Sequence, residues 1–165
     1  PLHQPRRQQA RRQAAEVCLS ARRIIACWPG FHDRLLGVAI DIGSTTIAAH
    51  LCDMATGEVV ASSGMMNPQI RFGEDLMSRV SYVMMNPDGR EAMTKAVRQA
   101  VSDLVDKVCT EGGVARTDIL DAVFVANPIM HHLFLGIDPT ELGQAPFALA
   151  VSGAGQRCDT VFILV

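Results

Sequence analysis

The segment that most constrains the fold spans residues 35 to 53 and reads LLGVAIDIGSTTIAAHLCD. Its first half is a continuous apolar run, which is typical of a buried central strand. Its second half alternates, so Ile47, Ala49 and Leu51 share one face of a strand. Only a few residues separate the two halves. The sequence therefore predicts a buried strand that bends sharply and returns along a neighbouring strand.

The residues that follow extend this hairpin into a mixed α/β domain. A turn at Gly57 leads into EVVASSGMM, which predicts a third strand and an antiparallel meander. Helical spacing of apolar residues predicts an amphipathic helix over residues 74 to 85. A longer helix follows the NPDG segment and ends at Gly112-Gly113. ILDAVFVA then predicts a fourth, buried strand.

A short helix is expected after the fourth strand. Asn127 suits its N-cap, Pro128 suits its first position, and Gly136 is expected to end it. The segment DPTELG predicts a turn, and TVFILV is the one candidate strand among the last residues. The order of elements predicts a mixed α/β sheet covered by helices.

The first 34 residues differ from the rest in charge. Residues 1–40 carry seven arginines against two acidic residues, whereas the remainder carries eight basic residues against fifteen acidic ones. We expect residues 1–34 to be a basic, poorly ordered leader, with a helix considered around residues 11 to 25. A nucleic-acid arm or a targeting segment is the alternative, although no aromatic residues interleave with the arginines. The acidic remainder predicts no nucleic-acid binding there.

Cysteine spacing and hydropathy predict the compartment. The cysteines are scattered and show no zinc or iron–sulfur spacing: Cys18, Cys27, Cys52, Cys109 and Cys158. An odd count without a secretory signal indicates reduced thiols. No apolar run reaches the roughly 20 residues of a membrane helix. We therefore expect a soluble, cytoplasmic protein without membrane contact.

The bend between the first two strands carries candidate binding chemistry. Asp41 ends the first strand, Gly43 permits a tight turn, and the amides and hydroxyls of Ser44, Thr45 and Thr46 can converge on an anion. A carboxylate at this place can hold Mg²⁺ through water. Carboxylate, metal and converging donors are what the β- and γ-phosphates of a nucleotide require. The same residues also suit an ordinary hairpin turn, and no Walker loop is present.

Several separated blocks resemble known proteins. VAIDIGSTTIAAHLCDMATGEVVA is similar to the first phosphate hairpin of the actin, sugar-kinase and heat-shock-chaperone ATPases. MNPQIRFGEDLMSRVSYVM and VFVANPIMHHLFLGIDPTELGQAPF resemble the carboxy-terminal ATPase domain of the reductive activators of corrinoid proteins. The latter resemblance covers about residues 36 to 154. It implies a truncated, ribonuclease H-like first lobe of an actin-like ATPase over residues 35–154, followed by an unassigned tail over residues 155–165.

The resemblance also implies a function. Members of that family carry a ferredoxin-type [2Fe–2S] domain and couple ATP hydrolysis to reduction of a Co(II) corrinoid on a partner protein, which yields Co(I) for methyl transfer. The implied cofactors are ATP with Mg²⁺, and the implied partner is a corrinoid protein. The [2Fe–2S] cluster belongs to the parent family, because this chain has no Cys-x₄-Cys-x₂-Cys to hold it.

Residue roles carry over only at matching positions. By resemblance, Asp41 is the catalytic position that holds magnesium and its water, and Gly43, Ser44, Thr45 and Thr46 cradle phosphate. Ser44 stands where a threonine is more usual. Asn127 ends a buried strand and is weighed both as a plain N-cap and as a contact to the nucleotide cleft. A further matching block lies near the cleft or at the partner surface: Asn67, Arg71, Gly73, Glu74, Asp75 and Arg79.

The sequence shows neither a second ATPase lobe nor an iron–sulfur domain. One hairpin supplies only part of a phosphate site, so we expect a fragment or frame-shifted chain with little or no ATP hydrolysis of its own. An exposed face meant for the missing lobe predicts self-association. Two alternatives stay open, a sugar- or acid-kinase-like lobe and a non-catalytic remnant or interaction module.

Other conspicuous residues receive structural interpretations. Adjacent helical histidines do not share a face, so His131 and His132 are expected at the surface or in a cap and not on a metal. Cys52 and Cys109 are expected as small core residues. Four methionines are expected to fill the core: Met65, Met66, Met84 and Met85. Four charged residues are expected on a solvated helix face: Arg98, Asp103, Asp106 and Lys107.

Overall fold

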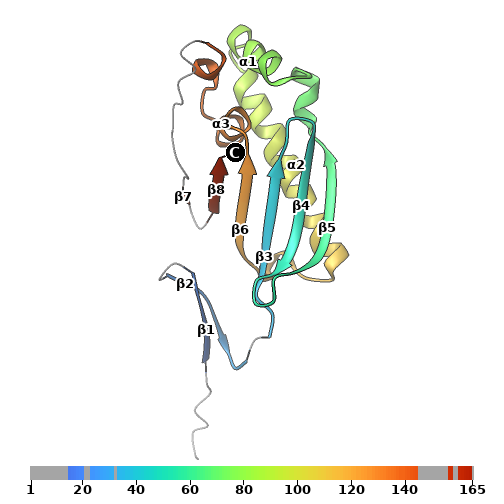
Figure 1. The fold of residues 1–165 in the computed structure, drawn as a ribbon, viewed down its shortest axis with the longest axis vertical. Coiled ribbons are helices and arrows are strands. Elements are labelled where there is room, and N and C mark those ends of the chain that lie inside the picture. Colours follow the sequence, from blue (N-terminus) through green and yellow to red (C-terminus); the bar gives the residue numbers. More distant parts are fainter. Residues whose placement is uncertain (1–14, 21–22, 32, 145–155, 158–159, 165) are drawn as a thin grey trace, which may run out of the picture. The chain divides into compact units, whose positions relative to one another are not determined.

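The computed structural model describes residues 15–20, 23–31, 33–144, 156–157 and 160–164 (Figure 1). The chain divides into two units, residues 1–34 and residues 35–165. In the first unit, β1 (Ala15–Ser20) and β2 (Arg23–Pro29) pair antiparallel, with Val17 opposite Cys27. The helix expected around residues 11 to 25 is therefore wrong for its described part, because β-branched and aromatic residues pair across a hairpin there. Poor order was expected for all of residues 1–34, of which residues 1–14, 21–22 and 32 lie outside the described residues.

The second unit is built on one mixed sheet with the strand order β5-β4-β3-β6-β8-β7. The predicted meander is confirmed as three antiparallel strands: β3 (Leu36–Ile42), β4 (Thr46–Asp53) and β5 (Glu58–Met66). The predicted fourth strand, β6 (Ile119–Ala126), runs parallel to β3. The candidate strand near the end forms as β8 (Thr160–Leu164), which is parallel to β6 and antiparallel to β7 (Gln156–Arg157). The expectation of a mixed α/β fold is confirmed.

The helices follow the predicted order. They are η1 (Pro68–Phe72), α1 (Leu76–Met85), α2 (Gly89–Gly112), η2 (Arg116–Asp118), α3 (Pro128–Leu135) and η3 (Thr140–Gly143), where η marks a short 3₁₀ helix. Helix α1 begins two residues later than expected because Asp75 caps it, with its carboxylate accepting the Ser78 amide at 2.7 Å. Gly113 and Gly136 end α2 and α3 in left-handed conformations. No helix in the described ranges is long and apolar enough to cross a membrane.

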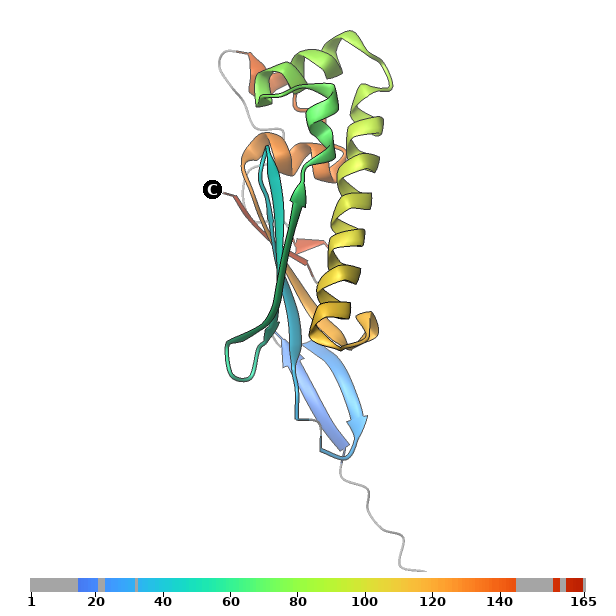
Figure 2. The same cartoon turned by 90° about the vertical axis from the view of Figure 1, so that its right-hand side faces the viewer.

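The core lies between one face of the sheet and the long helix α2, which packs across β4 and β5 (Figure 2). Alternate residues of β3 and β4 supply the sheet side: Ile40, Ile42, Ile47, Ala49 and Leu51. Residues at helical spacing supply the α2 side: Met93, Val97, Val101, Leu104 and Val108. The charged residues Arg98, Asp103, Asp106 and Lys107 are exposed, as predicted. Cys109 is buried as expected, and Cys52 is half-buried.

The expectation that four methionines fill the core is wrong for three of them. Met66, Met84 and Met85 are 70%, 54% and 75% exposed, and Met65 alone packs against the core. Met66 follows Met65 in a strand, so its side chain points to the other face of the sheet. The other two lie in the last turn of α1, where both side chains are exposed.

The opposite face of the sheet carries no helix among the described residues (Figure 2). Its central residues are small or polar, and they include Ala39, Asp41, Ala48 and His50. Asp41 is exposed and lies opposite Ala48 on β4 and Val125 on β6. The sheet therefore presents this carboxylate next to the first turn of the meander.

Candidate functional site

The turn at residues 43–46 lies at the edge where the parallel strands β3 and β6 both end (Figure 1). Ile42 pairs with Ala126 in the ladder, so Gly43 and Asn127 each lie one residue beyond the last matched pair. Asp41 precedes this point by two residues. The structure thus brings the predicted site residues to one edge of the sheet, where ligands of open α/β sheets commonly bind.

The bend requires glycine at its first position. The amide of Gly43 donates to the carbonyl oxygen of Thr46 at 3.0 Å. A Cβ atom on Gly43 would lie 2.6 Å from that same oxygen, which is closer than carbon and oxygen can approach. The tight turn expected from the sequence is present, and a side chain at this position would distort it.

Buried donors hold the inner side of this turn. The side-chain amide of Asn67 donates to Gly43 O at 2.8 Å, and the guanidinium of Arg79 donates through Nη2 to Ser44 O at 2.6 Å. The backbone amide of Asn67 donates to Thr45 O at 2.8 Å. Asn67 and Arg79 are both fully buried. Three consecutive carbonyl groups therefore accept hydrogen bonds from only two interior residues.

This arrangement sets the direction of the amides. In a planar trans peptide the C=O and N–H bonds point in opposite directions. Because the three carbonyls point toward Asn67 and Arg79, the N–H groups of Ser44, Thr45 and Thr46 point away from them. The amides of Ser44 and Thr45 donate to no residue in the described part of the chain. The turn consequently presents consecutive backbone donors, a pattern that suits an anion.

A compact polar cluster supports the two buried donors. Arg79 also donates through Nε to Gly73 O at 2.9 Å and through Nη1 to the Met130 sulfur at 3.2 Å. Asn67 accepts the Gln69 amide at 2.9 Å and so caps η1. A Cβ on Gly73 would lie 2.7 Å from the backbone nitrogen of Arg79, so η1 and α1 approach closely only with glycine at this position. The sequence left the position of this block open, and the structure places Asn67, Gly73 and Arg79 beside the turn.

The cluster contains the positive charge of Arg79. Arg79 forms no ion pair within the described residues. Burial lowers the pKa of Arg79, and the negative charge of Asp75 opposes this effect only in part. Hydrogen bonds from the amide and hydroxyl of Ser78 lower the pKa of Asp75. A guanidinium thus lies in a low-dielectric interior directly beneath Ser44.

An open groove of about 480 Å³ borders the outer side of the turn. Its lining combines the turn with the start of α1: Ser44, Thr45, Glu74, Asp75, Leu76 and Met77. Glu74 and Asp75 carry exposed carboxylates. The carboxylate of Asp41, which precedes Ser44 by three residues, is exposed as well. This balance of charge suits an anion that arrives with a divalent cation better than a bare anion.

Comparison with known proteins decides the family. The model of the RACo middle region matches residues 36–160. The chain belongs to the RACo middle region family. The corrinoid activation enzyme RamQ of Eubacterium limosum is 33% identical over 133 residues, which are 79% of this chain and 22% of that protein. A solved reductive activator for corrinoid, iron-sulfur protein shares 40% identity with a TM-score of 0.72, over 77% of this chain and 20% of the other.

These matches confirm the predicted likeness to reductive activators. This RACo middle region spans about a fifth of the length of the relatives it matches. The matched residues include the turn, the buried cluster and helix α3. The two relatives are named as activators, and neither name describes a kinase.

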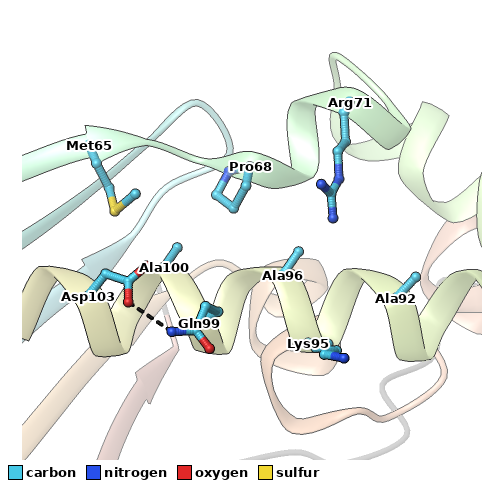
Figure 3. A pocket seen from close by; sticks show the side chains of 9 residues that line it. All are labelled: Met65, Pro68, Arg71, Ala92, Lys95, Ala96, Gln99, Ala100 and Asp103. Carbon is cyan, nitrogen blue, oxygen red and sulfur yellow. Dashed lines mark hydrogen bonds between the residues drawn. The ribbon is translucent and has the colours of Figure 1, made fainter.

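A second groove, of about 500 Å³, lies between η1 and α2 (Figure 3). Arg71 extends into it from η1, and Lys95 lies on the α2 side. Three alanines one helical turn apart form part of its floor: Ala92, Ala96 and Ala100. None of residues 43–46 lines it. Arg71 therefore lines this second groove, whereas Arg79 is buried beneath the 43–46 turn, although the two are close in sequence.

The surroundings of helix α3 contradict one expectation, for its two histidines, and confirm another, for its N-cap. His131 and His132 are both fully buried, so the surface position expected for them is wrong. The helix packs on several sides, which buries even adjacent residues, and His132 Nδ1 lies 2.7 Å from Pro128 O. Burial and the neighbouring His132 lower the pKa of His131. Asn127 caps α3 as predicted, accepting the Met130 amide at 2.9 Å.

The described residues contain no group of three or more His, Cys, Asp or Glu side chains that could hold a metal ion. The proposed roles of Asp41 and Asn127 toward a ligand stay predictions. Sequence reasoning missed the roles of Asn67 and Arg79. A signal for Arg79 was present, because Leu76, Arg79 and Val83 share the spacing of one helix face. An arginine within an apolar stripe indicates a buried charge with a specific partner.

Proposed function

We propose that this RACo middle region supplies one half of an ATP phosphate site in a reductive activator of corrinoid proteins. The observation that carries this proposal is the set of three consecutive carbonyls held by Asn67 and Arg79. Their bonding turns the amides of the 43–46 turn outward at the sheet edge that also carries the exposed Asp41. The names of the two relatives support the wider context of corrinoid activation.

The residues of the turn fit the terminal phosphates of ATP. The amides and hydroxyls of Ser44, Thr45 and Thr46 donate to phosphate oxygens, and Gly43 leaves the approach free of a side chain. The exposed Asp41 carboxylate would hold Mg²⁺, which keeps most of its waters in such sites. When bound, the ion would supply neutralisation of phosphate charge. Asn127, one residue past β6, offers a side-chain amide from the neighbouring strand.

We further propose that the domain is a ribonuclease H-like lobe of an actin-like ATPase. In this scheme a second lobe supplies the adenosine pocket and the opposing phosphate contacts, and a [2Fe–2S] domain supplies the electron. ATP hydrolysis changes the relative orientation of the lobes. This change alters the environment of the corrinoid on its partner protein, and it accompanies the Co(II) to Co(I) step. Because positioning provides most of phosphoryl-transfer catalysis, this chain alone is expected to hydrolyse ATP little or not at all.

A titration of the chain with MgATP, followed by ¹⁵N NMR, tests the proposal. We expect shift changes that centre on residues 44–46, with a dissociation constant in the millimolar range that is typical of a half-site. Asp41→Asn removes the magnesium dependence of these changes. Asp121→Asn is the matched control, because Asp121 lies on the same sheet face opposite Gly37, toward the other end of β3.

Two results contradict the proposal. One is a saturating titration in which the resonances of residues 44–46 do not move. The other is micromolar affinity with turnover by the chain alone, which would show a complete site and exclude the half-site interpretation.

A further inference from the structure

The buried guanidinium of Arg79 is costly to the fold. A charged group in the interior needs hydrogen bonds and a counter-charge to offset its lost hydration. Arg79 has the hydrogen bonds, to two backbone carbonyls and one sulfur, but no ion pair among the described residues. A methionine or leucine would fill the same interior without the cost of a buried charge, although Ser44 O and Gly73 O would then lose their donor. The charge therefore calls for an explanation beyond packing.

The contact with Ser44 connects that charge to the turn. Arg79 Nη2 donates to Ser44 O at 2.6 Å, and this oxygen belongs to the same peptide group as the Thr45 amide. Hydrogen bonds from ionised donors are about twice as strong as neutral ones. A donor on the carbonyl polarises the peptide and makes its N–H a stronger donor in turn. Arg79 thus raises the donor strength of the Thr45 amide without contacting a ligand.

Asn67 acts in the same way on the flanking peptide groups. Its side-chain amide polarises the peptide between Gly43 and Ser44, and its backbone amide polarises the peptide between Thr45 and Thr46. These donors are neutral, so their effect is smaller than that of the central guanidinium. The strongest polarisation falls on the middle peptide of the turn.

We propose that Arg79 is the positioning residue of the anion site, and that an anion held by the Thr45 amide supplies a counter-charge close to a guanidinium that forms no ion pair among the described residues. This inference rests on the proposed phosphate role of the turn and adds a residue that does not contact phosphate. It predicts that anion binding and the electronic state of the guanidinium are linked through one peptide group. A merely structural arginine would stabilise the turn without this link.

The first test uses the wild-type chain and inorganic phosphate in the presence of Mg²⁺. We expect the Thr45 amide and the Arg79 Nη2 proton to shift with the same dissociation constant. The side chain of Arg98 is the internal control, because its Nε donates to Phe134 O at 2.8 Å on an exposed surface. Movement of the Thr45 signal without the Arg79 signal overturns the inference, as does the absence of any shift at Thr45.

The second test compares variants. Arg79→Gln should move the Thr45 amide proton upfield in the ligand-free chain and weaken phosphate binding by about tenfold, because the charged donor is lost. Arg79→Lys keeps the charge and should recover part of the affinity. Arg98→Gln should leave both measurements unchanged. Equal phosphate affinity for wild type and Arg79→Gln overturns the inference, and should that variant not fold, the wild-type titration decides.

The outcomes separate this inference from the proposed function. MgATP binding that is insensitive to Arg79→Gln and Arg79→Lys refutes the positioning role and leaves the phosphate half-site intact. Phosphate binding that depends on Arg79, with no binding of MgATP at the turn, refutes the nucleotide function and leaves the positioning role intact.

Discussion

Strand β4 lies between two tight turns, residues 43–46 and residues 54–57, that use similar residue types. Each turn contains a glycine and at least one hydroxyl side chain, and each follows an aspartate within two residues, Asp41 or Asp53. The second turn is held mainly by local bonds: the Asp53 carboxylate accepts the Ala55 amide at 2.9 Å, Asp53 O accepts the Gly57 amide at 2.7 Å, and Thr56 Oγ1 accepts the Glu58 amide at 3.2 Å. The one bond to a distant residue, from the Met54 amide to Leu35 O at 2.6 Å, continues the pairing of β3 with β4 and uses no side chain. This is the ordinary chemistry of a hairpin.

The first turn is held by residues far away in the sequence. Its carbonyls bond to Asn67 and Arg79, which lie 24 and 35 positions beyond their acceptors Gly43 and Ser44. Its aspartate differs as well. The Asp53 carboxylate is buried and used locally, whereas the Asp41 carboxylate is exposed and accepts no hydrogen bond from any described residue. Composition does not distinguish a structural turn from a binding turn, but the source of the hydrogen bonds does.

The largest effect is expected from removing the central donor. Arg79→Leu leaves Ser44 O and Gly73 O without their donor, which should lower the free energy of unfolding by about 2–4 kcal/mol. Denaturant unfolding measures the change, and Arg98→Leu provides an exposed arginine as the control. A loss no greater than that of the control would mean that the first turn is no more dependent on distant residues than the second.

Glycine substitutions compare the two turns directly. Gly43→Ala places a Cβ 2.6 Å from Thr46 O, so the backbone must move, and we expect a loss of about 2 kcal/mol. Gly57 has a φ of 78° with open space around it, so Gly57→Ala should cost only about 1 kcal/mol of backbone strain. Thermal unfolding of both variants gives the comparison. Equal losses would remove the contrast between a crowded and an open turn.

Acid should weaken the first turn before the second. Met130 contacts both Arg79 and Asn67, and its neighbour His131 has a pKa lowered by burial and by His132. The folded chain therefore favours the neutral form of His131. The contribution of His131 to the free energy of unfolding is present when the pH is above the ordinary histidine pKa of about 6.5, and it is lost as pH falls through the lowered pKa. Unfolding followed from pH 8 to pH 5 should show this decline, and His131→Gln should flatten it. The protection of the Gly43 amide from hydrogen exchange, relative to the intrinsic exchange rate at each pH, should fall over this range, while the protection of the Gly57 amide does not.

The smallest effect is expected at the second turn. Thr56→Ala removes one exposed hydrogen bond, to the Glu58 amide, and should change the free energy of unfolding by less than about 0.5 kcal/mol. The same variant should leave MgATP-induced shifts at residues 44–46 unchanged in NMR spectra. A larger loss, or altered shifts, would show that the two turns are coupled through β4.

The comparison also explains what the sequence could predict. The strands β3 to β6, helix α2 and the cap at Asn127 were predictable because each depends on neighbours within a few residues, whereas the β1–β2 hairpin was not predicted. The site was predictable as far as the turn, whose residue types are contiguous. The roles of Asn67 and Arg79 were not, because they depend on how η1 and α1 fold back onto the turn. The burial of His131 and the exposure of Met66 likewise depend on packing between distant elements.

The close approach at Gly73 has a consequence for how this region tolerates change. The carbonyl of Gly73 holds Arg79, while the missing side chain of Gly73 gives the Arg79 backbone the room to be held. Substitution of either residue removes much of the stabilising contribution of the other. The losses in free energy of unfolding from the two substitutions should therefore be less than additive. We therefore expect diverging copies of this domain to keep or lose the two residues together.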